Sequence, residues 1–247
     1  MDAAHSNKWL DVWTRKGLEA EDGGLEALMR ADGFDAGTGA ISVDDWLRQA
    51  ANIAARLELD RAANVLEVGC GAGAMLWPLR DLGPALYGVD YSQTLAEVAA
   101  RSVPGLTAQR AEAVSLPFPD TMFDAVFSHG VFFYFPDLAY AVRALEEIVR
   151  VLAPGRGRAM VLDVPDLDRR DACERFRREV VYKGADYPTS PEGPYRHLYF
   201  PRALFSDFAA SQGMRAVFED QDLPSYPMGP YRFNVTLTFA AGGEHRG

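Results

Sequence analysis

A glycine-rich turn between a predicted buried strand and a predicted helix holds residue types suited to binding a ligand. Residues 65–73 read VLEVGCGAG, and glycines let the backbone pass close to a ligand with no Cβ in the way. The helix start adds free N–H groups and the positive end of the helix dipole. Asp90 lies seventeen residues beyond Gly73, where a carboxylate can accept hydrogen bonds from both hydroxyls of a ribose. This spacing predicts a nucleoside site at the carboxyl edge of a parallel sheet.

The glycine spacing alone leaves the type of nucleotide open. Gly69, Gly71 and Ala74 also satisfy the dinucleotide pattern Gly-x-Gly-x-x-Ala. Glu67, two residues before the first glycine, would repel a pyrophosphate but suits a ligand with a cationic amino group. An adenosyl ligand carrying an amine is therefore favoured. An NAD(P)-dependent oxidoreductase and a non-catalytic cofactor-binding module remain as alternatives.

Strand and helix patterns alternate around this turn. Strands are predicted over residues 64–69, 85–90, 106–110, 123–128 and 158–162, the first of them buried. Helices are predicted over residues 71–82, 92–100 and 138–152, with Ser92 and Asp137 able to cap two of them. The alternation predicts an α/β fold with a Rossmann-like, doubly wound sheet covered by helices on both faces.

The rest of the chain is expected to complete one domain over residues 1–247. Its predicted parts are an N-terminal helical arm or lid (1–60), a cofactor-binding core (61–163), a cap insertion (164–200), and a C-terminal helix with a closing hairpin (201–247). In the arm, Trp9 and Trp13 have helical spacing, and they either close over the ligand or anchor the arm to the core.

Five segments resemble, in the right order, the motifs of class I S-adenosylmethionine-dependent methyltransferases. They lie within residues 60–163 and are 65–73, 87–92 (YGVDYS), 110–118 (RAEAVSLPF), 123–129 (FDAVFSH) and 150–155 (RVLAPG). Two positions depart from the family pattern: Glu112 stands where Asp is more frequent, and Arg156 replaces a usual glycine. The resemblance implies a seven-stranded sheet whose last strand is antiparallel. It also implies S-adenosylmethionine as cofactor, with S-adenosylhomocysteine as product.

The resemblance also implies roles for residues at the methionine end of that cofactor. Glu67 would lie near the methionine amino group, and Gly69, Cys70 and Gly71 would form the turn. Ser128 would lie near the same end of the ligand.

At the adenosine end, the resemblance assigns four further residues. Asp90 would hold the ribose, and Tyr91 would pack on the adenine. Glu112 and Ala113 would border the adenine edge.

Two histidines are candidates for a catalytic role. His129 follows the fourth predicted strand at the mouth of the site, and His197 lies on the cap. Each is a general base or acceptor-orienting group on one interpretation and a hydrogen-bonded wall residue on the other.

Aromatic residues are the candidates for contacts with the methyl acceptor. Phe133 and Tyr134 follow the fourth strand, and Tyr195 and Tyr199 lie on the cap. Methyl transfer by in-line displacement to an O or N atom of a small molecule is the function expected, and a tyrosine-rich cap suggests a secondary metabolite.

Composition narrows the partners. The net charge of −10 disfavours nucleic acid and an anionic membrane surface. Two cysteines and an N-terminus without a signal-peptide pattern favour the cytoplasm. No zinc-type spacing occurs, and Asp163 has no neighbouring Asp-Asn pair, so no metal is expected. The sequence leaves the oligomeric state open.

Overall fold

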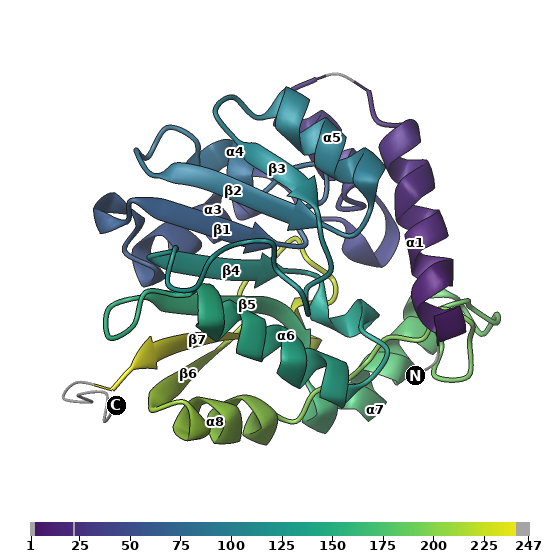
Figure 1. The fold of residues 1–247 in the computed structure, drawn as a ribbon. Coiled ribbons are helices and arrows are strands. Elements are labelled where there is room, and N and C mark those ends of the chain that lie inside the picture. Colours follow the sequence, from purple (N-terminus) through teal and green to yellow (C-terminus); the bar gives the residue numbers. More distant parts are fainter. Residues whose placement is uncertain (1–2, 22, 241–247) are drawn as a thin grey trace.

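The computed structural model describes residues 3–21 and 23–240, and a seven-stranded sheet forms its centre (Figure 1). The strands are β1 Asn64–Val68, β2 Ala85–Asp90, β3 Thr107–Arg110, β4 Ala125–His129, β5 Arg158–Pro165, β6 Met214–Asp220 and β7 Arg232–Phe239. Their order across the sheet is β3-β2-β1-β4-β5-β7-β6. Neighbouring strands are parallel except β7, which is antiparallel to β5 and β6. The predicted fold class is therefore confirmed.

Helices cover both faces of the sheet. They are α1 Ala3–Leu18, α2 Leu25–Ala31, α3 Val43–Arg56, α4 Leu76–Leu79, α5 Gln93–Ser102, α6 Leu138–Val151, α7 Arg170–Phe176 and α8 Arg202–Ser211. Val65 and Phe127 pack in one apolar cluster with α3 and α5, whereas Leu66 and Val126 pack in another with α6 and α8. Successive residues of each strand thus serve opposite faces, as the strand repeat requires.

Capping side chains start three helices, and those of α5 and α6 are the ones that the sequence predicts. The side chain of Ser42 accepts a hydrogen bond from the Asp45 N–H, Ser92 from Leu95, and Asp137 from Tyr140.

The predicted helix over residues 71–82 is wrong in extent. Most of this segment forms turns, and α4 is a single turn within it. Gly71 and Gly73 adopt φ angles of 53° and 90°, which a right-handed helix cannot include. Pro78 also lacks an N–H to donate.

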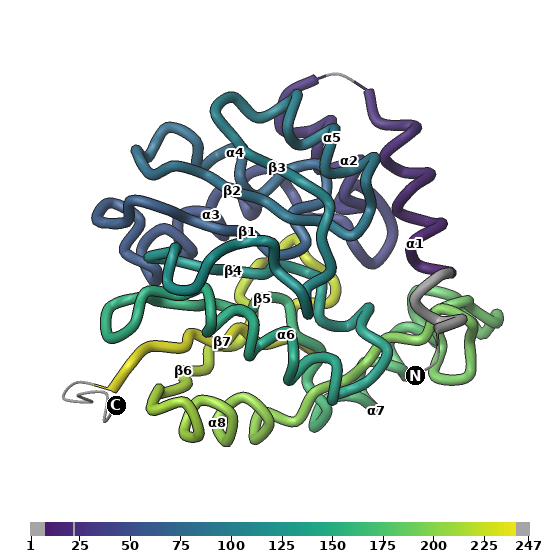
Figure 2. Tube along the Cα trace, viewed as in Figure 1, coloured from purple at the N-terminus to yellow at the C-terminus, as the bar shows by residue number. Residues whose placement is uncertain are grey.

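The N-terminal arm stands at the carboxyl edge of the parallel strands. Figure 1 shows α1 on the side to which the arrowheads of β2 and β3 point, and the trace in Figure 2 runs the same way. The Thr94 hydroxyl of α5 donates a hydrogen bond to the Thr14 carbonyl at 3.0 Å, which attaches the arm to the core.

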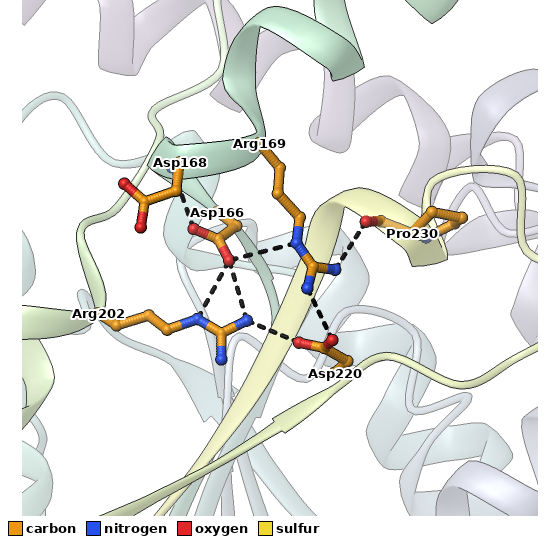
Figure 3. A network of polar contacts seen from close by, with 6 residues as sticks. All are labelled: Asp166, Asp168, Arg169, Arg202, Asp220 and Pro230. Carbon is orange, nitrogen blue, oxygen red and sulfur yellow. Dashed lines mark hydrogen bonds and ion pairs between the residues drawn. The ribbon is translucent and has the colours of Figure 1, made fainter.

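A network of charged groups fixes the base of the cap and the start of β7 (Figure 3). Arg202 donates to Asp166 at 2.9 Å and to Asp220 at 2.6 Å. Arg169 donates to Asp220 at 2.7 Å and to the Pro230 carbonyl at 2.8 Å. The network therefore joins the residues after β5 to α8, β6 and the turn that leads into β7.

Within residues 3–21 and 23–240, the helices are too short or too polar to cross a membrane.

Candidate active site

A cavity of about 330 Å³ lies at the carboxyl edge of the sheet. The ends of β1, β2, β4 and β5 form its floor, and α1, the α2 end, the cap and the start of β7 form its walls. Its position is where doubly wound sheets bind ligands, because the strand order reverses between β1 and β4.

The glycine turn after β1 adopts a conformation that side chains rarely allow. Gly69 has a φ of 79°, and a Cβ there would lie 2.4 Å from Val131 Cγ2. Gly71 has a φ of 53°, and a Cβ there would lie 2.2 Å from Asp32 Oδ1. Both glycines are therefore required by backbone conformation and by close neighbours.

Asp32, the residue that ends α2, holds this turn from the N-terminal arm. Its carboxylate accepts hydrogen bonds from the Ala72 N–H at 2.6 Å and the Ala74 N–H at 3.1 Å. Burial raises the pKa of Asp32 to about 7, although both hydrogen bonds act in the opposite direction. Sequence reasoning missed this residue, because no motif links it to a turn forty positions later.

Asp90 is anchored on the other side of the turn. Its carboxylate accepts from the Gly71 N–H at 3.0 Å and the Ser92 N–H at 2.8 Å. Burial raises the pKa of Asp90 to about 6. The side chain is buried yet lines the cavity, and its contact with a ribose stays a prediction.

Glu67 is the least satisfied of the three carboxylates. Only 2% of the residue is exposed, and its Oε2 has no hydrogen-bond partner within the described ranges. Burial raises its pKa well above the ordinary value, and the charges of Asp32 and Asp90 raise it further. We call Asp32, Glu67 and Asp90 the acidic half of the cavity.

The ion pairs found among the described residues include none to this acidic half. The positive charge of Lys16 lowers the pKa of Asp32, but burial outweighs it. Carboxylates concentrated in this way attract a cationic ligand, because uncompensated burial of charge is costly.

The predicted adenine contacts lie beside Asp90. Tyr91, Glu112 and Ala113 all line the cavity. Glu112 Oε2 accepts a hydrogen bond from the Tyr140 hydroxyl at 2.8 Å, which orients the carboxylate. Tyr140 also lines the cavity and was not predicted, because it lies inside an ordinary amphipathic helix.

His129 stands at the centre of the cavity floor, at the end of β4. Its ring lies 5.4 Å from the Phe34 ring and 5.2 Å from the Trp46 ring, centroid to centroid. Burial lowers the pKa of His129 to about 4, so the imidazole is neutral near pH 7. Its Nε2 has no hydrogen-bond partner among the residues described.

Beyond His129, a buried ion pair forms the opposite wall. Arg232 Nε lies 3.6 Å from Asp163 Oδ1, and the Tyr226 hydroxyl donates to Asp163 Oδ2 at 3.0 Å. All three residues are buried and line the cavity. Asp163 adopts a φ of 60°, at the irregular part of the β5–β7 pairing. We call Arg232, Asp163 and Tyr226 the arginine half of the cavity.

Aromatic rings cover the arginine half. Tyr134 and His197 lie with ring centroids 4.5 Å and 5.8 Å from Trp9, and Phe133 lies 4.7 Å from His197. Trp9 and Trp13 line the cavity, so α1 closes it on this side.

Three predicted residues lie elsewhere. The Ser128 hydroxyl donates to the Val68 carbonyl at 2.8 Å, behind the cavity wall. Tyr199 donates to Glu174 at 2.6 Å within the cap, and Tyr195 packs on the outer side of the cover, 5.0 Å from Trp9. Their contacts with a ligand stay predictions.

Cys70 lines the cavity as part of the turn, and a Cβ on Gly88 would lie 2.7 Å from its sulfur. The Cys70 side chain therefore fills the space that the missing side chain of Gly88 in β2 leaves.

No cluster of three or more His, Cys, Asp or Glu side chains in the described ranges is arranged to hold a metal ion.

Comparisons with known proteins agree with this geometry. Residues 66–159 match a family model described as a methyltransferase domain. The chain is 35% identical over 127 residues to a demethylmenaquinone methyltransferase of Thermus thermophilus, covering 49% of this chain and 54% of that protein. The chain thus spans about half the length of the curated relatives it matches.

Solved structures share the fold at low identity. Magnesium protoporphyrin IX methyltransferase of Synechocystis PCC 6803, with bound S-adenosylhomocysteine, has a TM-score of 0.60 at 15% identity, covering 80% of this chain and 84% of that chain. The cyclase SpnF has a TM-score of 0.59 at 18% identity, covering 84% and 86%. The domain match and the shared fold support a class I S-adenosylmethionine-dependent methyltransferase, as the five motifs predicted.

Proposed function

We propose that the protein transfers a methyl group from S-adenosylmethionine to an O or N atom of a small molecule held beside His129. The observation that carries the proposal is the acidic half of the cavity, which has three carboxylates and no ion-pair partner in the described chain. S-adenosylmethionine supplies an amine and a sulfonium for these carboxylates and an activated methyl group for transfer. Among the structural neighbours, the Synechocystis enzyme binds the corresponding product.

The residues fit this cofactor in detail. Glu67 Oε2, buried and without a hydrogen-bond partner in the described ranges, can accept from an ammonium. Asp90 lines the cavity beside the turn of Gly69 and Gly71, where its carboxylate can accept from the ribose hydroxyls. A dinucleotide would instead bring its pyrophosphate against Asp32 and Glu67, which disfavours the oxidoreductase alternative.

For the reaction, the protein must hold the acceptor atom in line with the methyl group at about 3–3.5 Å. His129 is positioned to orient that atom, because its Nε2 has no other partner in the described chain. Its low pKa makes the neutral imidazole a hydrogen-bond acceptor for a hydroxyl or amine and a poor store for a proton. The aromatic cover bounds the acceptor in size.

The acceptor class is supported by charge and enclosure. The net charge of −10 disfavours nucleic acid, and Trp9 and Trp13 close the cavity beside Tyr134. The tyrosines of the cap remain the motive for proposing a secondary metabolite.

Titration calorimetry with S-adenosylmethionine, S-adenosylhomocysteine and NAD⁺ tests the ligand. We expect both sulfur compounds to bind at micromolar concentration and NAD⁺ not to bind. Binding of NAD⁺ alone would overturn the proposal. An acceptor screen with methyl-labelled S-adenosylmethionine then tests transfer, and binding without transfer to any acceptor would favour a cofactor-binding module.

A further inference from the structure

Arg232 is a buried cation with unsatisfied hydrogen-bond donors. Only 4% of the residue is exposed, and its Nε and Nη1 have no hydrogen-bond partner in the described ranges. The nearest carboxylate, Asp163, lies 3.6 Å from Nε, which is beyond a normal hydrogen bond. A guanidinium has five N–H donors, so one loose ion pair leaves most of them unsatisfied. Burial of such a group is stabilised when a ligand supplies the missing oxygens.

The backbone around Arg232 is held in place. The Asp166 N–H donates to the Tyr231 carbonyl at 3.0 Å, and Arg169 donates to the Pro230 carbonyl at 2.8 Å. Both contacts belong to the network of Figure 3 or lie beside it. Because two tethers precede Arg232 directly, its side chain enters the cavity from a fixed point. The site is therefore built before any ligand arrives.

The surroundings of Arg232 select a flat anion. One face of the guanidinium lies over the Phe133 ring, with Cζ 4.8 Å from the ring centroid. Nη1 is among the donors left without a partner in the described ranges, and the donors of a guanidinium match the two oxygens of a carboxylate. Asp163 already contributes one negative charge, so a dianionic phosphate is disfavoured there relative to a monoanion.

The two halves of the cavity differ in the ligand charge that they accept. The acidic half would repel a carboxylate, whereas the arginine half lacks an acceptor for its donors. A carboxylate at Arg232 would place the remainder of the molecule between Phe133, Tyr134 and His129, next to the cofactor side.

We propose that the methyl acceptor is a small carboxylic acid whose carboxylate is bound by Arg232, with Phe133 beneath the guanidinium. This proposal rests on the proposed function, because it names the substrate class of the same site. It makes Arg232 a specificity-determining residue, whereas His129 orients the atom that is methylated.

The test compares acids with their own amides. Benzoate, 4-hydroxybenzoate, phenylacetate and short aliphatic acids are titrated against their primary amides, with and without S-adenosylhomocysteine. We expect at least one acid to bind the wild-type protein roughly tenfold more tightly than its amide, because hydrogen bonds to a charged group are stronger than those to a neutral one. If no acid exceeds its amide, or if phenylphosphonate exceeds benzoate, the proposal is wrong.

Two arginine variants sharpen the result. In Arg232→Gln the preference for acid over amide should disappear, whereas Arg175→Gln, an exposed arginine on α7, should retain it. Binding of S-adenosylhomocysteine to Arg232→Gln shows that the variant is folded. A preference that survives Arg232→Gln would contradict the proposal. Should that variant fail to fold, the comparison of acids and amides on wild-type protein decides alone.

The same titrations separate this proposal from the proposed function. If S-adenosylhomocysteine fails to bind, the methyltransferase function is wrong whatever the acids do. If it binds and the acids show no preference over amides, only the role of Arg232 is wrong.

Discussion

The acidic half and the arginine half belong to one cavity but differ in the charge of the ligand group that each is suited to bind. Around the glycine turn, Asp32 and Asp90 accept backbone N–H groups and Glu67 lacks a partner in the described chain, so this half is suited to a cation. Across His129, Arg232 lacks hydrogen-bond acceptors, so that half is suited to an anion. The contrast shows how one cleft can orient two ligands, since the acidic half repels a carboxylate and the arginine half holds the unpartnered donors that a carboxylate needs.

Among the substitutions in the acidic half, Asp90→Ala should weaken cofactor binding most. In Asp90→Ala the ribose loses its acceptor, and the Gly71 and Ser92 N–H groups lose theirs. We expect affinity for S-adenosylhomocysteine to fall by roughly a hundredfold or more, because each lost partner costs about 1–3 kcal/mol. Calorimetry measures the change, and circular dichroism checks the fold. An affinity within threefold of wild type would contradict the ribose role.

Replacing Glu67 by glutamine should show whether the charge of this side chain or its size matters for cofactor binding. Glu67→Gln keeps the size of the side chain, and we expect affinity for S-adenosylmethionine to fall by about tenfold or more while affinity for adenosine changes little. The ligand-free variant should also melt at a higher temperature, since a buried carboxylate with an unsatisfied oxygen has been removed. A lower Tm combined with unchanged affinity would show that Glu67 is only structural.

The pH dependence should follow the raised pKa values of the acidic half. The pKa of Asp32 is raised from 3.8 to about 7 and that of Asp90 to about 6, so both take up protons in the ligand-free fold. A cationic ligand displaces those protons, and its affinity should rise from pH 5 to pH 8. Calorimetry in buffers of different ionisation enthalpy measures the proton release. Asp32→Asn should reduce the release near pH 7, and an unchanged release would exclude Asp32 as its source.

The stability of the ligand-free protein should change with pH in the direction opposite to that of the ligand affinity. Between about pH 4 and pH 7 the folded chain binds more protons at Asp32 than the unfolded chain, so the free energy of unfolding contributed by this group falls as pH rises. Denaturant titrations of ligand-free wild type and Asp32→Asn should converge at low pH and separate at high pH.

His129 lies between the halves, and its loss should affect neither ligand's charge recognition. We expect His129→Ala to bind S-adenosylhomocysteine within twofold of wild type, while turnover falls by roughly tenfold to a hundredfold, as for a lost acceptor-orienting contact. His129→Asn, which can still accept a hydrogen bond, should recover part of the rate. Unchanged turnover in His129→Ala would remove the proposed role.

Local signals made most of the fold predictable. The strand predicted over residues 85–90 has the observed bounds of β2, and Ser92 and Asp137 cap the helices that they were predicted to cap. The cofactor side was equally accessible, because Glu67 and Asp90 belong to short motifs with fixed spacing. The helix over residues 71–82 failed because two glycines there take positive φ angles that composition does not reveal.

Residues that reach the site through tertiary packing could not be predicted. Asp32 comes from the arm and Arg232 from the far side of the sheet, and neither lies near a motif. Their roles depend on where α2 ends and how β7 pairs with β5. Conversely, Tyr199 looked available in the sequence but its hydroxyl is bound by Glu174 within the cap.

A crystal structure with S-adenosylhomocysteine and an acid selected by the titrations tests the division of the cavity most directly. The account predicts the homocysteine ammonium within hydrogen-bond distance of Glu67, the ribose hydroxyls on Asp90, and the carboxylate on Arg232. A structure with the nucleoside on the Arg232 side, or with an empty glycine turn, would contradict it.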